Sequence, residues 1–133
     1  MRFFAVLISF ATLVFSSSAS AAENWVCDEA RDNASLLQCA DGEFRKYDAE
    51  LNRIYAVLMK DAATMSAPQS GYGAPPVQAL RNAQRAWIAF RDSNCHWKAT
   101  AFYGGTGQAV IMANCRAIAT RDRVDEFKEF QEN

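Results

Sequence analysis

The stretch AQRAWIAFRDSNC, residues 83–95, decides the fold because its residue types recur at three- and four-residue steps, the spacing of a helix. At about 100° per residue, one stripe of this helix combines apolar side chains with two long polar ones. The stripe consists of Leu80, Gln84, Trp87, Ile88, Arg91 and Cys95. An unpaired charge in a core is prohibitively costly, so the two polar residues need partners. We therefore expect Gln84 and Arg91 to tie this helix to another one.

The partner helix is expected upstream, from Glu43 to about Ala63, where apolar residues again recur at helical spacing. Asp48 and Asn52 lie at the edge of its apolar stripe. We predict that Arg91 reaches Asp48 as a planar arginine–carboxylate pair, with Gln84 and Asn52 nearby. The alternative is that Arg91 faces a cleft and binds the carboxylate or phosphate of a ligand.

The rest of the chain predicts an all-α fold. Residues 66–76, SAPQSGYGAPP, contain all three prolines and form a loop. A helix from about Val77 to Ala101 follows, and the glycines of residues 103–107, YGGTG, permit a reversal into a last helix. No strand alternation of useful length is present. We expect a small disulfide-stapled bundle of about three main helices plus a short N-terminal helical piece.

The first 22 residues have the pattern of a secretory signal peptide. Arg2 precedes the apolar run FFAVLISFATLVF, and small residues ending in Ala19-Ser20-Ala21 fit a cleavage site. The apolar run is shorter than the ~20 residues that span a bilayer, so a retained anchor is the weaker alternative. We expect residues 1–22 to be removed, residues 23–133 to form one domain without a stable membrane anchor, and the protein to be periplasmic or secreted.

Four cysteines, Cys27, Cys39, Cys95 and Cys115, are an even number in an exported chain, which is typical of a disulfide framework. Metal binding is disfavoured because the chain has no C-x-x-C pair and only one histidine. Of the three connectivities, the pairing of Cys27 with Cys39 and of Cys95 with Cys115 closes the shortest loops. Twelve helical residues would span about 18 Å, so the chain must turn between Cys27 and Cys39. Asp32-Asn33 or Ser35 suit the start of a helix there.

The mature chain carries a cluster of motifs at defined spacing. They are Asp48-x-x-Leu51-Asn52-x-x-Tyr55, Ala83-Gln84-Arg85-x-Trp87-x-x-Phe90-Arg91-Asp92-x-x-Cys95, Tyr103-x-Gly105 and Thr120-x-x-Arg123, together with the four cysteines. Over roughly residues 27 to 127 the sequence resembles the LprI-type domain family, which is named for a mycobacterial lipoprotein reported to inhibit lysozyme. The resemblance implies a secreted, helical, disulfide-bonded domain and a lysozyme as partner. This chain differs from that lipoprotein because it has no cysteine at the leader's cleavage point.

Two functional classes follow, and neither is an enzyme. The single histidine, His96, has no catalytic signature around it, and the thiols are expected to be oxidised. An inhibitor needs only a protruding segment, and two loops place a tyrosine beside glycine. We expect the binding residues to be Tyr72, His96, Lys98, Tyr103, Gly104 and Gly105. The alternative is a non-enzymatic interaction module that binds another envelope protein or a cell-wall fragment.

No cofactor, metal or nucleic acid is expected. The formal net charge of −1 gives no basic surface of the kind that nucleic acid requires. The paired acidic residues of the chain are adjacent in sequence, so on a helix they point in different directions. The sequence does not determine the oligomeric state.

Overall fold

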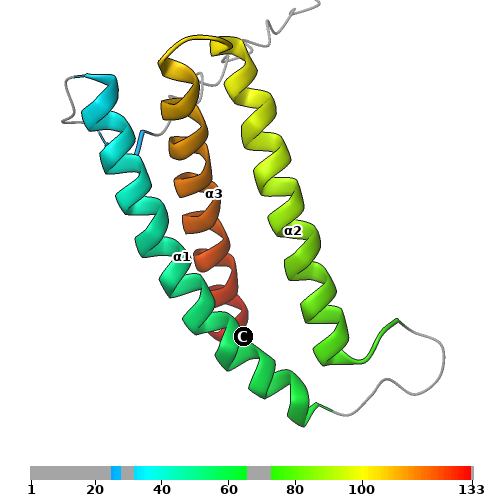
Figure 1. Ribbon diagram of the computed structural model, residues 1–133. Coiled ribbons are helices and arrows are strands. Elements are labelled where there is room, and N and C mark those ends of the chain that lie inside the picture. Colours follow the sequence, from blue (N-terminus) through cyan, green and yellow to red (C-terminus); the bar gives the residue numbers. More distant parts are fainter. Residues whose placement is uncertain (1–24, 28–31, 66–72, 133) are drawn as a thin grey trace, which may run out of the picture.

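The protein is an antiparallel arrangement of three long helices. The computed structural model describes residues 25–27, 32–65 and 73–132, and these contain α1 (Asn33–Thr64), α2 (Pro76–Ala99), the short 3-10 helix η1 (Thr100–Phe102) and α3 (Gly107–Glu132). In Figure 1, α1 and α3 run in the same direction and α2 runs back between them in chain order. No strand occurs in these residues, so the all-α prediction is confirmed.

The predicted short N-terminal helical piece is continuous with α1, which begins earlier than expected. Asp32 has extended backbone angles, and its side chain accepts a hydrogen bond from the Ser35 backbone N–H at 2.8 Å. The Ser35 hydroxyl oxygen in turn accepts from the Asp32 N–H, which completes a capping box. The helix therefore begins at Asn33 and continues through Gly42 into the predicted Glu43–Ala63 segment. In the described residues, the expected N-terminal piece is the first part of α1.

The prolines set the start of α2. Pro75 precedes the helix and Pro76 occupies its first turn, where a missing backbone N–H costs nothing. α1 has already ended at Thr64, with Met65 as its C-cap. The predicted binding residue Tyr72 lies outside the described residues.

Two apolar clusters hold the helices together. The larger one joins α1 to α3 through Leu51, Ile54, Leu58, Val124 and Phe127, with Tyr55, Leu80 and Trp87 packed against it. The smaller one, around Cys27, Ala40 and Ala113, lies near the start of α1. Burial of an aliphatic or aromatic side chain of this size stabilises a fold by roughly 1.5–3 kcal/mol.

Both predicted disulfides are present, and the predicted pairing is confirmed. Cys27–Cys39 has a Cα–Cα distance of 6.1 Å and Cys95–Cys115 one of 5.5 Å, both within the range that a disulfide requires. The first attaches the segment before α1 to that helix, and the second joins the end of α2 to the start of α3. Both therefore lie at the same end of the bundle (Figure 1).

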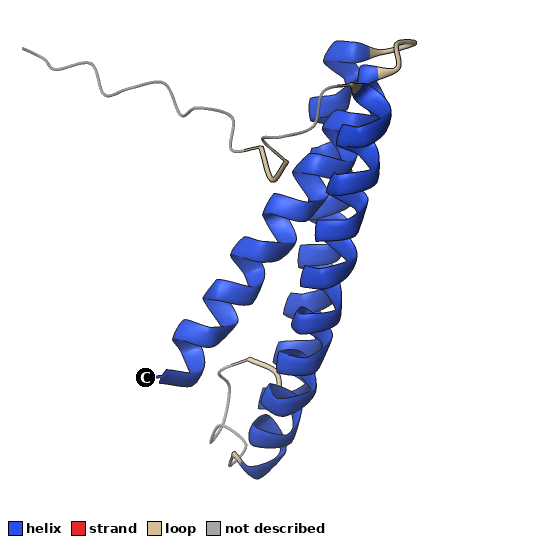
Figure 2. Ribbon diagram, turned by 90° about the vertical axis from the view of Figure 1, so that its left-hand side faces the viewer, coloured by secondary structure: helices blue, strands red, loops and turns tan. Residues whose placement is uncertain are grey.

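The opposite end of the bundle is more open. Figure 2 shows α3 leaning away from the other two helices toward its C-terminal end. Within the described residues, no helix has the length and apolar character needed to cross a bilayer.

Candidate functional site

The polar residues of the opening stretch lie in a stack of arginines and aromatic rings between the helices. The Arg91 guanidinium lies 5.2 Å from the centre of the Phe44 ring and 5.1 Å from that of Trp87. Arg116 lies 4.2 Å from the Phe44 ring. Cation–π contacts of this kind strengthen when they are desolvated. Phe44 belongs to α1, Trp87 and Arg91 to α2, and Arg116 to α3, so the stack connects all three helices.

Arg91 makes closer contacts than the predicted one to Asp48. Its Nη1 atom lies 3.9 Å from Asp48 Oδ1, whereas its Nε donates to Asp92 Oδ1 at 2.9 Å. Nη1 also donates to the Thr120 hydroxyl at 3.3 Å, and that hydroxyl donates to the Arg116 carbonyl. Arg91 is only 5% exposed. Its guanidinium thus already has protein partners, which argues against the alternative that Arg91 binds a ligand carboxylate.

Gln84 and Asn52 have separate partners in the structure. The Gln84 side-chain oxygen accepts from Arg123 Nε at 3.3 Å, and the Asn52 amide donates to Asp48 within α1 at 3.2 Å. Arg123 also lies 4.3 Å from the Phe127 ring. The polar stripe of α2 is therefore satisfied mainly by α3, through Thr120 and Arg123. These α3 partners could not be assigned before the helices were placed.

One buried polar atom of the stack is left without a hydrogen bond. Arg116 Nε is buried and has no hydrogen-bond partner among the described residues, although it lies 3.5 Å from Asp92 Oδ1. Asp92 therefore serves two arginines, Arg91 through a hydrogen bond and Arg116 through charge alone. We conclude that this stack sets the helix register.

The turn between α2 and α3 is exposed at the stapled end of the bundle. Gly104 adopts φ +78°, a conformation that favours glycine. The Tyr103 N–H donates to the Thr100 carbonyl at 3.1 Å, and the Gly105 N–H donates to the Phe102 carbonyl at 3.0 Å. The Asn33 amide of α1 donates to the Thr106 hydroxyl at 2.8 Å. The turn is thus fixed by its own hydrogen bonds, by α1 and by the disulfide beneath it.

The predicted binding residues are only partly brought together. Tyr103 is 84% exposed at the tip of the turn, next to Gly104 and Gly105. Lys98 and His96 are exposed on the last turn of α2, but two residues apart on a helix they point about 200° from each other. Both lie in the last turn of α2, where a positively charged side chain stabilises the helix C-terminus. His96 and Lys98 therefore face different sides of the same end.

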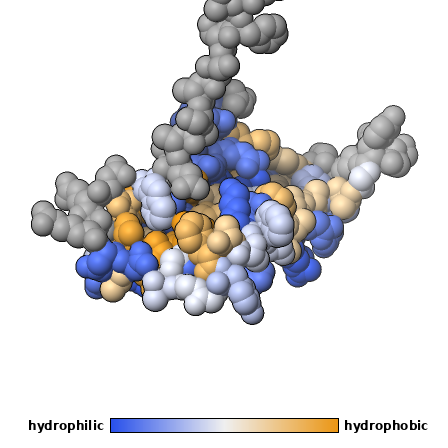
Figure 3. All heavy atoms as spheres, turned by 90° about the horizontal axis from the view of Figure 1, so that it is seen from above, coloured by the Kyte–Doolittle hydropathy of each residue, from blue (hydrophilic) through white to orange (hydrophobic). Residues whose placement is uncertain are grey.

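Exposed aromatic residues near the turn were missed by the sequence reasoning. Trp97 is 72% exposed and Phe102 49% exposed. Seen from above, this end of the bundle carries hydrophobic surface intermixed with hydrophilic surface (Figure 3). Trp97 lies outside the core stripe of α2, so a helical wheel could have identified it as an exposed aromatic residue.

The described residues contain no group of three His, Cys, Asp or Glu side chains arranged to hold a metal ion. The exposed side chains around the α2–α3 turn include those of His96, Trp97, Lys98, Phe102 and Tyr103.

The chain is similar to known proteins. The chain is 35% identical over 113 residues to an uncharacterized protein of Rhizobium meliloti (strain 1021), covering 80% of this chain and 79% of that protein. No solved structure matches the chain. The family described as lysozyme inhibitor LprI matches residues 27–127, which include all four cysteines and the whole arginine stack. The protein therefore belongs to the lysozyme inhibitor LprI family.

Proposed function

We propose that this protein inhibits a lysozyme by binding it directly through the α2–α3 turn. Membership of a family of lysozyme inhibitors supports an inhibitor-like function. The observation that carries the choice of surface is Tyr103, which is 84% exposed at the tip of a turn held from several sides.

The chemistry of the target suits the residues of the turn. A lysozyme acts with two carboxyl groups in an open groove, one of them held in its protonated form. The Tyr103 hydroxyl can donate a hydrogen bond to a carboxylate, and Lys98 supplies a nearby positive charge. The neighbouring Phe102 and Trp97 add apolar area, which aromatic residues contribute at small cost in conformational entropy.

The rigidity of the turn supports the proposal further. A loop that is ordered before binding loses little freedom in the complex, so more of its contact energy appears as affinity. The Cys95–Cys115 disulfide and the Asn33–Thr106 hydrogen bond both reduce that loss. His96 faces another side of the helix and contributes less than Lys98 in this arrangement.

The same proposal places the protein outside the cytoplasm. Two disulfides persist in an oxidising compartment, and residues 1–22 have the pattern of a cleaved leader. A periplasmic or secreted protein of residues 23–133 would meet lysozymes at the cell wall that they degrade.

The test is the rate of peptidoglycan lysis by several lysozyme types with increasing amounts of the oxidised protein. We expect saturable inhibition near equimolar protein. Tyr103→Ala combined with Lys98→Ala should raise the half-inhibitory concentration by about tenfold or more, as loss of an interface anchor does. Tyr103→Phe removes only the hydroxyl, so its effect on inhibition distinguishes the contribution of the hydroxyl from that of the ring.

The matched control is Lys60→Ala, which removes an exposed lysine from the far part of α1. It should inhibit as the parent protein does. Full potency of the double variant would move the contact surface elsewhere. Absence of inhibition with every lysozyme type would overturn the function itself and leave the interaction-module alternative.

A further inference from the structure

The open end of the bundle contains a cavity that the proposed lysozyme contact does not use. It has a volume of about 790 Å³ and lies where α1 and α3 end and α2 begins. This volume is in the range of ligand pockets, about 300–1,000 Å³. Its floor is formed by the buried residues Leu58, Ala62 and Phe127. Such a floor favours an apolar occupant.

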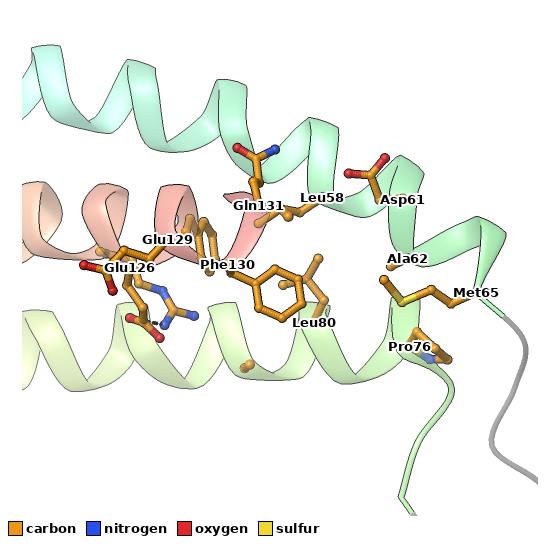
Figure 4. A pocket seen from close by; sticks show the side chains of 13 residues that line it. Leu58, Asp61, Ala62, Met65, Pro76, Leu80, Glu126, Glu129, Phe130 and Gln131 are labelled. Carbon is orange, nitrogen blue, oxygen red and sulfur yellow. Dashed lines mark hydrogen bonds and ion pairs between the residues drawn. The ribbon is translucent and has the colours of Figure 1, made fainter. Parts of the chain in front are cut away.

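The apolar surface extends beyond the cavity onto its rim. Phe130 lines the cavity and is 64% exposed, and Met65 is 50% exposed. Figure 4 shows the Phe130 side chain between α3 and α2, beside Leu80. A row of apolar side chains on a protein segment would cover both the floor and the rim.

The charges around the cavity are mainly negative. Asp61, Glu126 and Glu129 line it, and among the described residues that line it Arg123 alone has a positive charge. Arg123 is paired with Glu126, to which its Nη1 donates at 2.7 Å, and its Nε donates to Gln84. The charges of Arg123 and Glu126 therefore largely cancel, and the net negative charge of the lining comes from Asp61 and Glu129. The cavity therefore attracts cations more than anions.

The helix ends add to this negative potential. α1 and α3 both end at the cavity, and neither has a basic residue in its last turn. Helix C-termini carry partial negative charge, and the N-terminus of α2 offsets only one of the two. The electrostatic bias thus comes from backbone and side chains together.

We infer that this cavity is a docking site for a basic amphipathic helix of a partner protein, which inserts apolar side chains between Leu80 and Phe130. Basic residues flanking that apolar row would lie near Asp61 and the C-terminal ends of α1 and α3. The site goes beyond the proposed lysozyme contact, since the α2–α3 turn lies at the opposite end of the molecule (Figure 1).

The test uses a synthetic amphipathic peptide of leucine and lysine, a peptide in which glutamate replaces lysine, and a scrambled leucine–lysine peptide. Calorimetry with the full oxidised protein should show saturable binding of the first peptide only. Amide resonances of Leu80, Ala83 and Phe130 should shift during the titration. Equal binding of the glutamate or the scrambled peptide, or no binding of any, would overturn the inference.

Two pairs of variants locate the binding. Asp61→Lys should weaken binding by about tenfold, whereas Asp41→Lys, the same change at the other end of α1, should not. Ala83→Trp, which fills the cavity, should weaken binding, whereas Ala86→Trp on the exposed face of α2 should not. Melting temperatures verify that each variant folds. Equal effects within either pair would contradict the site.

Lysozyme inhibition by the same variants separates the two proposals. Asp61→Lys should inhibit as the parent protein does, because it leaves the α2–α3 turn intact. An Asp61→Lys variant that lost inhibition together with peptide binding would show that the cavity is not an independent site.

Discussion

At the scale of single residues, the fold depends on how a buried arginine is satisfied. Arg91 has a hydrogen bond to the carboxylate next to it in sequence, one to the Thr120 hydroxyl of α3, and only a 3.9 Å approach to Asp48. Leaving a buried guanidinium without such partners would cost several kcal/mol. The function of AQRAWIAFRDSNC is therefore to fix the position of α2 against α3.

The two carboxylates near Arg91 should differ in their effect on stability. We expect Asp92→Asn to lower the free energy of unfolding by about 1 kcal/mol, because Asp92 serves Arg91 and Arg116 while its side chain is about half exposed. Asp48→Asn should cost less than about 0.5 kcal/mol, since its contact with Arg91 is longer. Urea unfolding of both variants measures the difference. A larger loss for Asp48→Asn would show that Asp48, the partner predicted from sequence, matters more to Arg91 than Asp92 does.

At the scale of helices, the sequence predicted which segments are helical better than it predicted how far α1 extends. Apolar spacing predicted the main helices, and short loop lengths predicted the disulfide pairing, because both depend on local geometry. The continuation of α1 through Gly42 was missed, since glycine costs about 1 kcal/mol in a helix. Packing of Leu36, Leu37 and Ala40 around the first disulfide stabilises this segment. Tertiary packing thus outweighed local propensity.

The candidate site was less predictable for a related reason. Thr120 and Arg123 are partners of α2 only because α3 has a particular register, which no local pattern specifies. The cavity at the open end depends on where α3 diverges from its neighbours (Figure 2). The exposed position of Tyr103, in contrast, could be predicted from its glycine neighbours alone.

The contact between α1 and α3 contains a carboxylate with a shifted pKa. Hydrogen bonds from Arg53, and the charges of Arg53 and Lys128, lower the pKa of Glu50 from 4.5 to about 2. A carboxyl whose pKa is lowered by folding stabilises the fold above its ordinary pKa. That stabilisation is lost as the pH falls from about 4.5 to about 2.

This shift can be measured directly. The side-chain carboxyl carbon of Glu50 should titrate by NMR with a midpoint near pH 2 rather than 4.5. Glu50→Gln should make stability less dependent on pH across that interval. A Glu50 midpoint close to 4.5 would show that the contacts to Arg53 and Lys128 do not persist in solution.

At the scale of the whole molecule, the two disulfides should have similar effects on stability and different effects on binding. Replacing either pair of cysteines by serine should lower the free energy of unfolding by about 3 kcal/mol, the loop-entropy value for separations of 12 and 20 residues. Only the Cys95–Cys115 pair supports the α2–α3 turn. Its loss should weaken lysozyme inhibition more than loss of Cys27–Cys39, as lysis assays under folded conditions would show. Equal inhibition by the two variants would argue against the turn as the contact surface.

Because both disulfides lie at one end of the molecule, its two ends differ in how firmly the helices are held together. The segment before α1 and the junction of α2 with α3 are covalently closed, while the far ends of the described helices carry no such link. We expect the helices to move less relative to one another at the end that the disulfides close. A partner at the turn would then meet a surface of fixed shape and must fit it. A partner at the cavity would meet helix ends that no disulfide joins, so their separation could adjust to its width.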